Sequence, residues 1–117
     1  MIDRNQRKAL IEAYKLALPP MGVFSITNRA NGKMLIDQSA NVTAAFNRHR
    51  MELRLGTHRN KPLMEDWRTY GEANFAFDVL QTIEERAEPD FNYNAELASA
   101  LTNWRVRVPL GSETSYL

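Results

Sequence analysis

One segment, residues 22–37, constrains the fold more than any other part of the sequence, because it has the pattern of a β-hairpin. Residues 21–28 (MGVFSITN) are rich in apolar and β-branched side chains, which favour a strand. Asn31-Gly32 predicts a tight turn, since both residues tolerate positive φ. Residues 33–37 (KMLID) then form the returning strand. Any fold for this chain must therefore contain an antiparallel strand pair.

Apolar side chains recur at helical spacing on both sides of the hairpin. Residues 3–18 predict an amphipathic helix that Asp3 caps and Pro19-Pro20 ends. After the hairpin, Ser39 or Asn41 can cap a long helix that Gly56 ends. That helix carries one stripe of core-type residues: Val42, Ala45, Phe46, His49 and Leu53.

Two further helices and one further strand complete the pattern. Residues 61–71 predict a short helix with Leu63, Trp67 and Tyr70 along one side. Residues 74–81 (NFAFDVLQ) alternate as a strand does, so Phe75, Phe77 and Val79 share a face. A last helix from Asn94 carries a stripe and ends at Pro109; the stripe is Leu97, Leu101, Trp104 and Val108.

The order α-ββ-α-α-β-α predicts an α+β domain, with a small, mostly antiparallel sheet of three strands flanked by helices. A chain of 117 residues is expected to form one domain overall. Within it, we expect residues 1–20 to form a helix that packs on a body of residues 21–117.

Composition narrows the chemistry. The chain has no Cys, which excludes disulfides, thiolate metal sites and cysteine nucleophiles. No apolar run approaches the ~18 residues of a membrane span, so we expect no membrane partner. The start, MIDRNQRKAL, lacks the apolar core of a signal peptide, and a cytoplasmic location is the expectation.

Charge is polarised along the sequence, although the net charge is only +1. Residues 45–61 contain five basic residues and one acidic residue, whereas residues 84–96 contain five acidic residues and one basic residue. On charge alone, each run is more simply explained as a solvated face.

The ordered set of segments resembles the GIY-YIG nuclease superfamily. Gly22-Val23-Phe24 stands where that family has Gly-Ile-Tyr, and Leu35-Ile36-Asp37 stands where it has Tyr-Ile-Gly. Residues 46–80 are similar to the helix, histidine-containing loop and third strand that follow. NWRVRV and the final SYL are similar to the closing helix and the Gly-Tyr-Asn that often ends the domain. The resemblance runs from residue 21 to the C-terminus and favours a divergent bacterial branch of the superfamily.

The resemblance implies an active site that this sequence has lost. In active members, a glutamate on the last helix binds a divalent metal, a first-strand tyrosine helps to deprotonate water, and an arginine and a second tyrosine hold the phosphate. Those positions are Phe24, Leu35, Ala45 and Leu101 here, and the final asparagine is Leu117. Two histidines that match the family remain, His49 and His58. We therefore expect no catalytic residues and no cofactor, and an apolar cleft lined by the four replaced positions, with Phe24 exposed on its wall.

Some positions allow more than one interpretation. Asp37 is a weak metal candidate that, with Arg48, could form a rearranged site for Mg²⁺ or Mn²⁺; a solvated strand end and a surface charge are the simpler explanations. His49 lies on an apolar helical stripe, so a core role is favoured over a catalytic one. His58 lies in a basic loop, where contact with a phosphate and capping of the next helix are equally good explanations.

Three functions remain open. One is an inactive nuclease-like module that binds DNA or RNA through a basic surface made of Arg48, Arg50, Arg54, His58, Arg59 and Lys61. The second is a protein-interaction module that uses the apolar former cleft or the acidic loop at 84–90. The third is a metal-dependent endonuclease with a rearranged site. The sequence does not indicate an oligomeric state.

Overall fold

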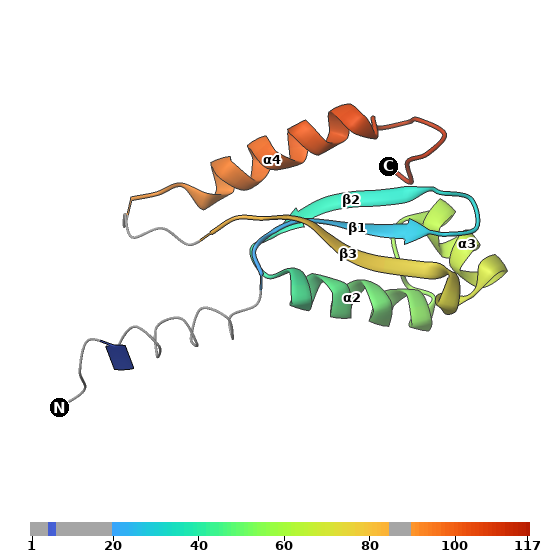
Figure 1. Ribbon diagram of the computed structural model, residues 1–117. Helices are drawn as coiled ribbons and strands as arrows, with labels where there is room; N and C mark the ends of the chain where they lie inside the picture. Colours follow the sequence, from blue (N-terminus) through green and yellow to red (C-terminus); the bar gives the residue numbers. More distant parts are fainter. Residues whose placement is uncertain (1–4, 7–19, 85–89) are drawn as a thin grey trace.

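The structure is a computed structural model of the chain, and it describes residues 5–6, 20–84 and 90–117 (Figure 1). The helix expected over residues 3–18 therefore lies almost entirely outside the described residues, and its packing on residues 21–117 stays a prediction. Residues 85–89 of the acidic loop also lie outside them.

The described elements follow the predicted order. They are β1 (Gly22–Asn28), β2 (Met34–Ser39), α2 (Val42–Leu55), α3 (Lys61–Tyr70), the short 3₁₀ helix η1 (Glu72–Asn74), β3 (Phe75–Thr82) and α4 (Tyr93–Arg107). The predicted α+β class is confirmed. Element boundaries agree because strong local signals set them. Asn41 caps α2 by accepting a hydrogen bond from the Ala44 N–H at 2.9 Å, and Gly56 ends it at φ 75°.

The sheet has the order β2-β1-β3, and both strand pairs are antiparallel. Successive side chains of a strand point to opposite faces, so Phe24 and Ile26 face one side and Val23 faces the other. Figure 1 shows α2 and α3 on one side of the sheet and α4 on the other. The sheet is thus the middle layer between two helical layers.

Each face of the sheet has its own apolar core. The first core, on the side of α2 and α3, contains Phe24, Ile26, Leu35, Val42, Ala45, Leu53, Leu63, Met64, Trp67, Phe75 and Tyr116. The second core, under α4, contains Val23, Ile36, Ala100 and Leu101, with Met34, Leu80, Ile83, Trp104 and Val108 packed against it. Burial of these side chains is the main stabilising contribution to the domain.

Two residues on the predicted apolar faces are exposed. Tyr70 is exposed and Met64 is buried in its place, because Tyr70 is the last residue of α3, where Gly71 turns the chain away toward β3. Val79 is also exposed, although it pairs with Phe24 across β1 and β3. It lies on a strand at the edge of the sheet, beside a break in the register at Val23/Phe24.

The C-terminal tail after α4 is mostly irregular, but it is tied to the sheet. Ser115 forms an isolated parallel bridge with Met34 of β2. The Tyr116 N–H donates to the Met34 carbonyl at 3.0 Å, and the Tyr116 ring is buried in the first core. The tail therefore completes the side of the sheet that faces α2 and α3.

Candidate functional site

The strand and helix positions that match the family's tyrosines and arginine lie together on the α2 face of the sheet. Phe24, Leu35 and Ala45 are only 1%, 3% and 7% exposed, and all belong to the first core. The Phe24 ring meets the edge of Phe46 at a centroid distance of 5.4 Å. The expectation that Phe24 is exposed on a cleft wall is wrong, because neighbouring rings from α2 fill that space.

Leu101 lies elsewhere. It is 8% exposed and packs in the second core with Val23 and Ile36, on the face of the sheet that α4 covers. The prediction that all four replaced positions point into one cleft is therefore wrong for Leu101. Leu101 packs against Val23, and Val23 points to the opposite face of the sheet from Phe24 because side chains alternate along β1. Periodicity identified the buried stripe of α4 but could not say which face of the sheet it covers.

The two histidines meet at the edge of the first core. His49 Nδ1 lies 2.8 Å from His58 Nε2, and the ring centroids are 5.1 Å apart. The Asn60 N–H donates to His58 Nδ1 at 3.0 Å, so that nitrogen is an acceptor and the His58 proton lies on Nε2. His58 therefore donates to His49 Nδ1, which places the His49 proton on its own Nε2. That Nε2 is buried and has no hydrogen-bond partner in the part of the chain that the structure describes.

The electrostatic surroundings keep this pair neutral. Burial, together with the neighbouring His58 and Arg48, lowers the pKa of His49 to about 4, outweighing the opposite effect of Glu52 and Asp37. Burial also lowers the pKa of His58, with Arg48 acting in the same direction. His49 is only 6% exposed and its ring lies 5.7 Å from that of Phe24. The core role predicted for His49 agrees with this position.

The positions that would hold a divalent cation do not suit one. The Asp37 carboxylate is half-buried and accepts a hydrogen bond from the Gln38 N–H at 2.8 Å. Among the described residues, no three His, Cys, Asp or Glu side chains are placed to share a metal ion. Leu101, which the sequence resemblance equates with the family's glutamate, lies on the opposite face of the sheet. A hard cation needs several oxygen ligands, which this arrangement does not bring together.

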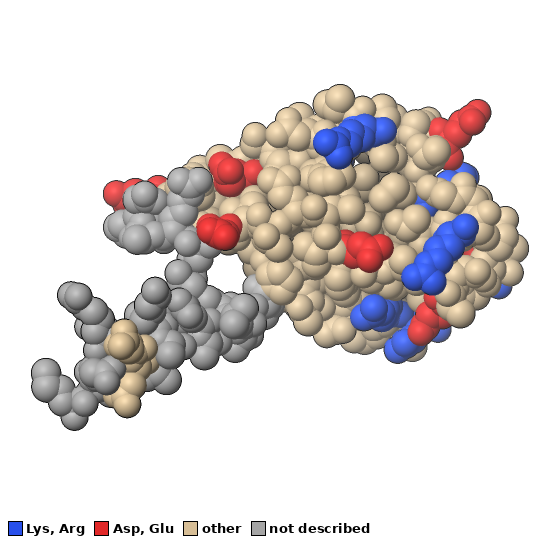
Figure 2. Space-filling view, viewed as in Figure 1, with Lys and Arg blue, Asp and Glu red and all other residues tan. Residues whose placement is uncertain are grey.

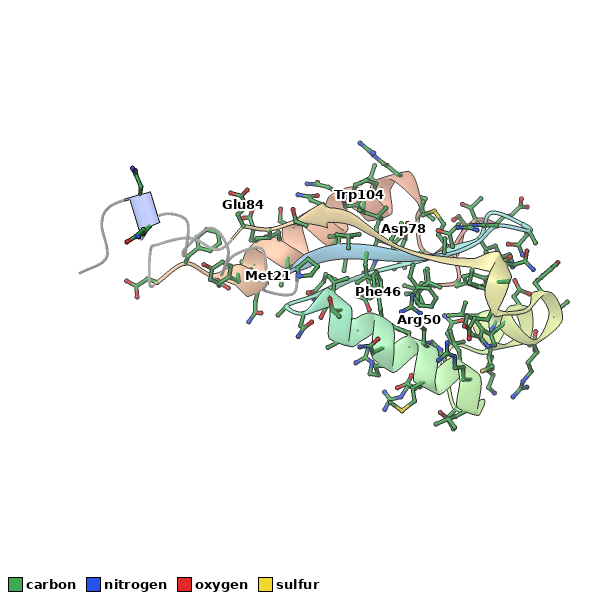
Figure 3. The ribbon with its side chains drawn as sticks, turned by 60° about the horizontal axis from the view of Figure 1, so that its bottom comes forward. Met21, Phe46, Arg50, Asp78, Glu84 and Trp104 are labelled. Carbon is green, nitrogen blue, oxygen red and sulfur yellow. The ribbon has the colours of Figure 1, made fainter. Side chains whose placement is uncertain are left out.

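The basic residues predicted to bind phosphate differ in how available they are. Arg54 forms two hydrogen bonds with Glu72, at 2.6 and 2.7 Å. The Arg50 guanidinium lies over the Phe77 ring, 4.2 Å from its centroid, and the Phe77 ring is also in edge contact with Phe46. Figure 3 shows Phe46 and Arg50 on the side of α2 that faces the sheet. These two arginines are therefore held by protein groups along the side of α2 that lies near β3.

The other cations are exposed near the beginning of α3. Arg48 lies close enough to both histidines to lower their pKa values. Arg59 and Lys61 flank Asn60, which caps α3 by accepting from the Leu63 N–H at 3.0 Å. Arg48, Arg59 and Lys61 are exposed. In Figure 2, basic side chains gather over the end of the molecule built from α2 and α3, and acidic ones at the end where the chain leaves β3.

A polar network beneath the hairpin turn was not predicted from the sequence. The Tyr116 hydroxyl donates to Asp66 Oδ2 at 2.7 Å, and the buried Asn28 amide donates to the Tyr116 oxygen at 3.2 Å. Asn31 donates to the same Asp66 oxygen at 3.0 Å. Burial opposes ionisation of Asp66, but together the hydrogen bonds from Tyr116, Asn31 and Asn28 lower its pKa. The final SYL was a signal for Tyr116, whereas nothing in the sequence marked Asp66.

Comparison with solved structures identifies the fold. The catalytic domain of the homing endonuclease I-TevI matches with a TM-score of 0.62 and 23% identity, over 82% of this chain and 95% of that one. A point mutant of the same intron endonuclease domain matches with a TM-score of 0.62 and 18% identity, over 75% of this chain and 82% of that one. No protein-family model matches the chain, and neither does any curated protein. The chain has a GIY-YIG-like fold. In the described part of the chain, no helix is both long and apolar enough to cross a membrane.

Proposed function

We propose that this chain is a nucleic-acid-binding protein that keeps a GIY-YIG-like nuclease fold without metal-dependent cleavage of the phosphate backbone. The observation that carries the proposal is the group of three exposed cations around His58 and the beginning of α3: Arg48, Arg59 and Lys61. It lies beside a former catalytic face that packed apolar side chains fill. The proposal keeps the bacterial, cytoplasmic setting expected from the sequence.

The binding half of the proposal follows from charge and backbone geometry. A phosphate group is attracted by exposed guanidinium and ammonium groups, whose contacts dominate affinity for nucleic acid. The beginning of a helix adds the partial positive charge of its first N–H groups. Because Lys61 is the first residue of α3 and Arg59 precedes its cap, both features coincide at one place.

The non-catalytic half rests on the chemistry of the replaced positions. Phe24 and Leu35 have no hydroxyl that could accept or donate a proton, and Ala45 has no charge with which to hold a phosphate. Leu101 offers no oxygen to a cation and lies across the sheet from the other three positions. The two remaining histidines, His49 and His58, are neutral and hydrogen-bonded to each other.

The two alternative functions are a protein-interaction module and an endonuclease with a rearranged site. Burial of Phe24, Leu35 and Ala45 argues against docking of a protein partner on the former cleft, and Leu35→Asp is expected to disrupt folding instead of an interface. Docking through the exposed acids Glu84, Asp90 and Glu96 stays a prediction, because part of that loop lies outside the described residues. An endonuclease with a rearranged site at Asp37 and Arg48 also stays a prediction.

Fluorescence anisotropy tests the proposal with a labelled 20-base-pair duplex and a 20-nucleotide single strand of mixed sequence. The triple variant Arg48→Ala, Arg59→Ala, Lys61→Ala should flatten the dependence of log affinity on log salt by up to about 0.9 per lost phosphate contact on duplex DNA. Arg107→Ala is the matched control, since Arg107 lies on α4 and stacks on Trp104 at 4.7 Å. That variant should keep the slope of the unmodified protein.

Two results would contradict the proposal. One is absence of binding to either oligonucleotide at 50 mM salt. The other is a triple variant whose salt dependence equals that of the unmodified protein. Incubation of plasmid with Mg²⁺ or Mn²⁺ covers the catalytic alternative: nicking that Asp37→Ala or Arg48→Ala abolishes would replace this proposal with the rearranged endonuclease.

A further inference from the structure

The pairing of Arg54 with Glu72 connects the last turn of α2 to the 3₁₀ helix η1. Arg54 Nε donates to Glu72 Oε1 at 2.6 Å and Arg54 Nη2 donates to Glu72 Oε2 at 2.7 Å. Two parallel N–H donors thus meet both oxygens of one carboxylate. Both side chains are exposed, so the pair lies on the surface and within reach of a ligand from solvent.

A second arginine of α2, Arg50, acts electrostatically on the same carboxylate. Hydrogen bonding from Arg54 lowers the pKa of Glu72, and the positive charge of Arg50 lowers it further. Arg50 lies one helical turn before Arg54, and its guanidinium is held over the Phe77 ring. Glu72 is therefore ionised at neutral pH and neutralises part of the basic surface from within.

Carboxylate and phosphate present the same geometry to arginine. Each offers two oxygens that the planar guanidinium can bind with two parallel hydrogen bonds. A phosphate of a nucleic acid can occupy the Arg54 fork only after the Glu72 carboxylate has left it. We infer that Glu72 is an intramolecular competitor that occupies the phosphate-binding fork of Arg54 and thereby restrains nucleic-acid affinity at this end of α2. This inference rests on the proposed nucleic-acid-binding function.

The competitor divides the basic surface into two parts. Arg48, Arg59 and Lys61 have no ion pair among the described residues and can take a phosphate directly. Arg54 contributes to binding only when Glu72 is displaced. Nucleic acid therefore follows the beginning of α3, and extends to the end of α2 when it can replace the carboxylate. Under this inference, the six basic residues expected from the sequence act as two groups and not as one surface.

Anisotropy titrations of the labelled duplex between 50 and 200 mM salt test the inference with Glu72→Gln. Glutamine keeps the length of the side chain but removes its charge, so Arg54 becomes available to phosphate. One added phosphate contact steepens the salt slope by about 0.9, which makes the gain in affinity about threefold larger at 50 mM than at 200 mM salt. Glu96→Gln is the matched control: it removes one negative charge from α4, on the opposite face of the sheet.

The double variant Arg54→Ala, Glu72→Gln separates release of Arg54 from a general change in charge. It should lose the steeper slope that Glu72→Gln alone produces. Three results would overturn the inference but not the proposed function. The unmodified protein and Glu72→Gln could bind with the same affinity and salt slope, the gain in affinity could persist in the double variant that lacks Arg54, or Glu96→Gln could produce the same gain. Absence of binding in every variant, Glu72→Gln included, would overturn the proposed function with it. Thermal unfolding of each variant confirms that the compared proteins are folded.

Discussion

Acidification should destabilise this domain through His49. The pKa of this residue is about 4 in the folded protein and 6.5 in an unfolded chain. Between those values the unfolded state binds a proton that the folded state does not bind, so the free energy of unfolding falls as the pH falls. The stabilising contribution is therefore fully present above about pH 7 and is lost progressively down to about pH 4.

The magnitude follows from the difference between the two pKa values. Each unit corresponds to about 1.4 kcal/mol, so the full contribution is about 3 kcal/mol, of which about 2 kcal/mol is lost at pH 5. This is a large share of the 5–15 kcal/mol typical of a folded domain. Protonation is unfavourable because a proton on His49 Nδ1 would meet the N–H of His58, whose nitrogen lies 2.8 Å away. The Phe24 ring packs against His49 and excludes water from this side.

Urea unfolding followed by tryptophan fluorescence at pH 7.5, 6.5, 5.5 and 4.5 measures this contribution. Because carboxylates also titrate at the acidic end, the informative quantity is the difference between the unmodified protein and His49→Gln, which has no titratable group at that position. We expect the variant to be less stable at pH 7.5 and to show a shallower loss toward pH 4.5. The NMR titration of the His49 ring in the folded protein reports its pKa independently.

Equal pH dependence of the two proteins would refute the argument, since His49 would then titrate alike in the folded and unfolded states. An NMR pKa near 6.5 for the folded protein would do the same. In either case the hydrogen-bond directions assigned to Asn60, His58 and His49 would have to be reversed or abandoned.

Two further perturbations test other parts of the structure. Tyr116→Phe removes the hydroxyl that donates to Asp66 and accepts from Asn28. It should lower the free energy of unfolding by about 1–3 kcal/mol, because the buried Asn28 amide loses a partner. Tyr70→Phe, at an exposed position, should have almost no effect in the same urea titration. Leu101→Glu places a carboxylate at the position that the sequence resemblance equates with a metal-binding glutamate, but calorimetry should detect no new Mg²⁺ site and the domain should lose several kcal/mol of stability, since the charge enters the apolar core under α4. Tight Mg²⁺ binding by that variant would contradict the placement of Leu101.

Local signals in the sequence were sufficient to predict the strands and α-helices of residues 20–84 and 90–117, but not the short 3₁₀ helix η1. The turn at Asn31-Gly32, the cap at Asn41 and the stop at Gly56 act through neighbouring backbone atoms, so each can be recognised without knowledge of the fold. The α+β class and the order of elements followed from these signals and from apolar periodicity. Burial of Ala45, His49 and Leu53 followed in the same way, from a stripe on one helix.

Long-range contacts could not be predicted in this way. Periodicity shows that Leu101 is buried but not against which face of the sheet, because both faces of this sheet are apolar. The partner of Arg54 lies 18 residues away in η1, and Asp66 lies 50 residues from Tyr116. The charge run at 45–61 therefore overestimated the free basic surface, since composition counts charges without their partners.

The hydrogen bond between the two imidazoles also constrains how this sequence can change over time. Replacement of one histidine leaves a buried ring nitrogen of the other without a partner, which costs stability. Replacement of both by apolar side chains of similar shape leaves no unpaired imidazole nitrogen, although it also takes the acceptor from the Asn60 N–H, so the double change should cost less than the sum of the two single ones. Positions 49 and 58 are therefore expected to co-vary among proteins of this fold: both histidine where the pair is kept, and both apolar where it has been lost.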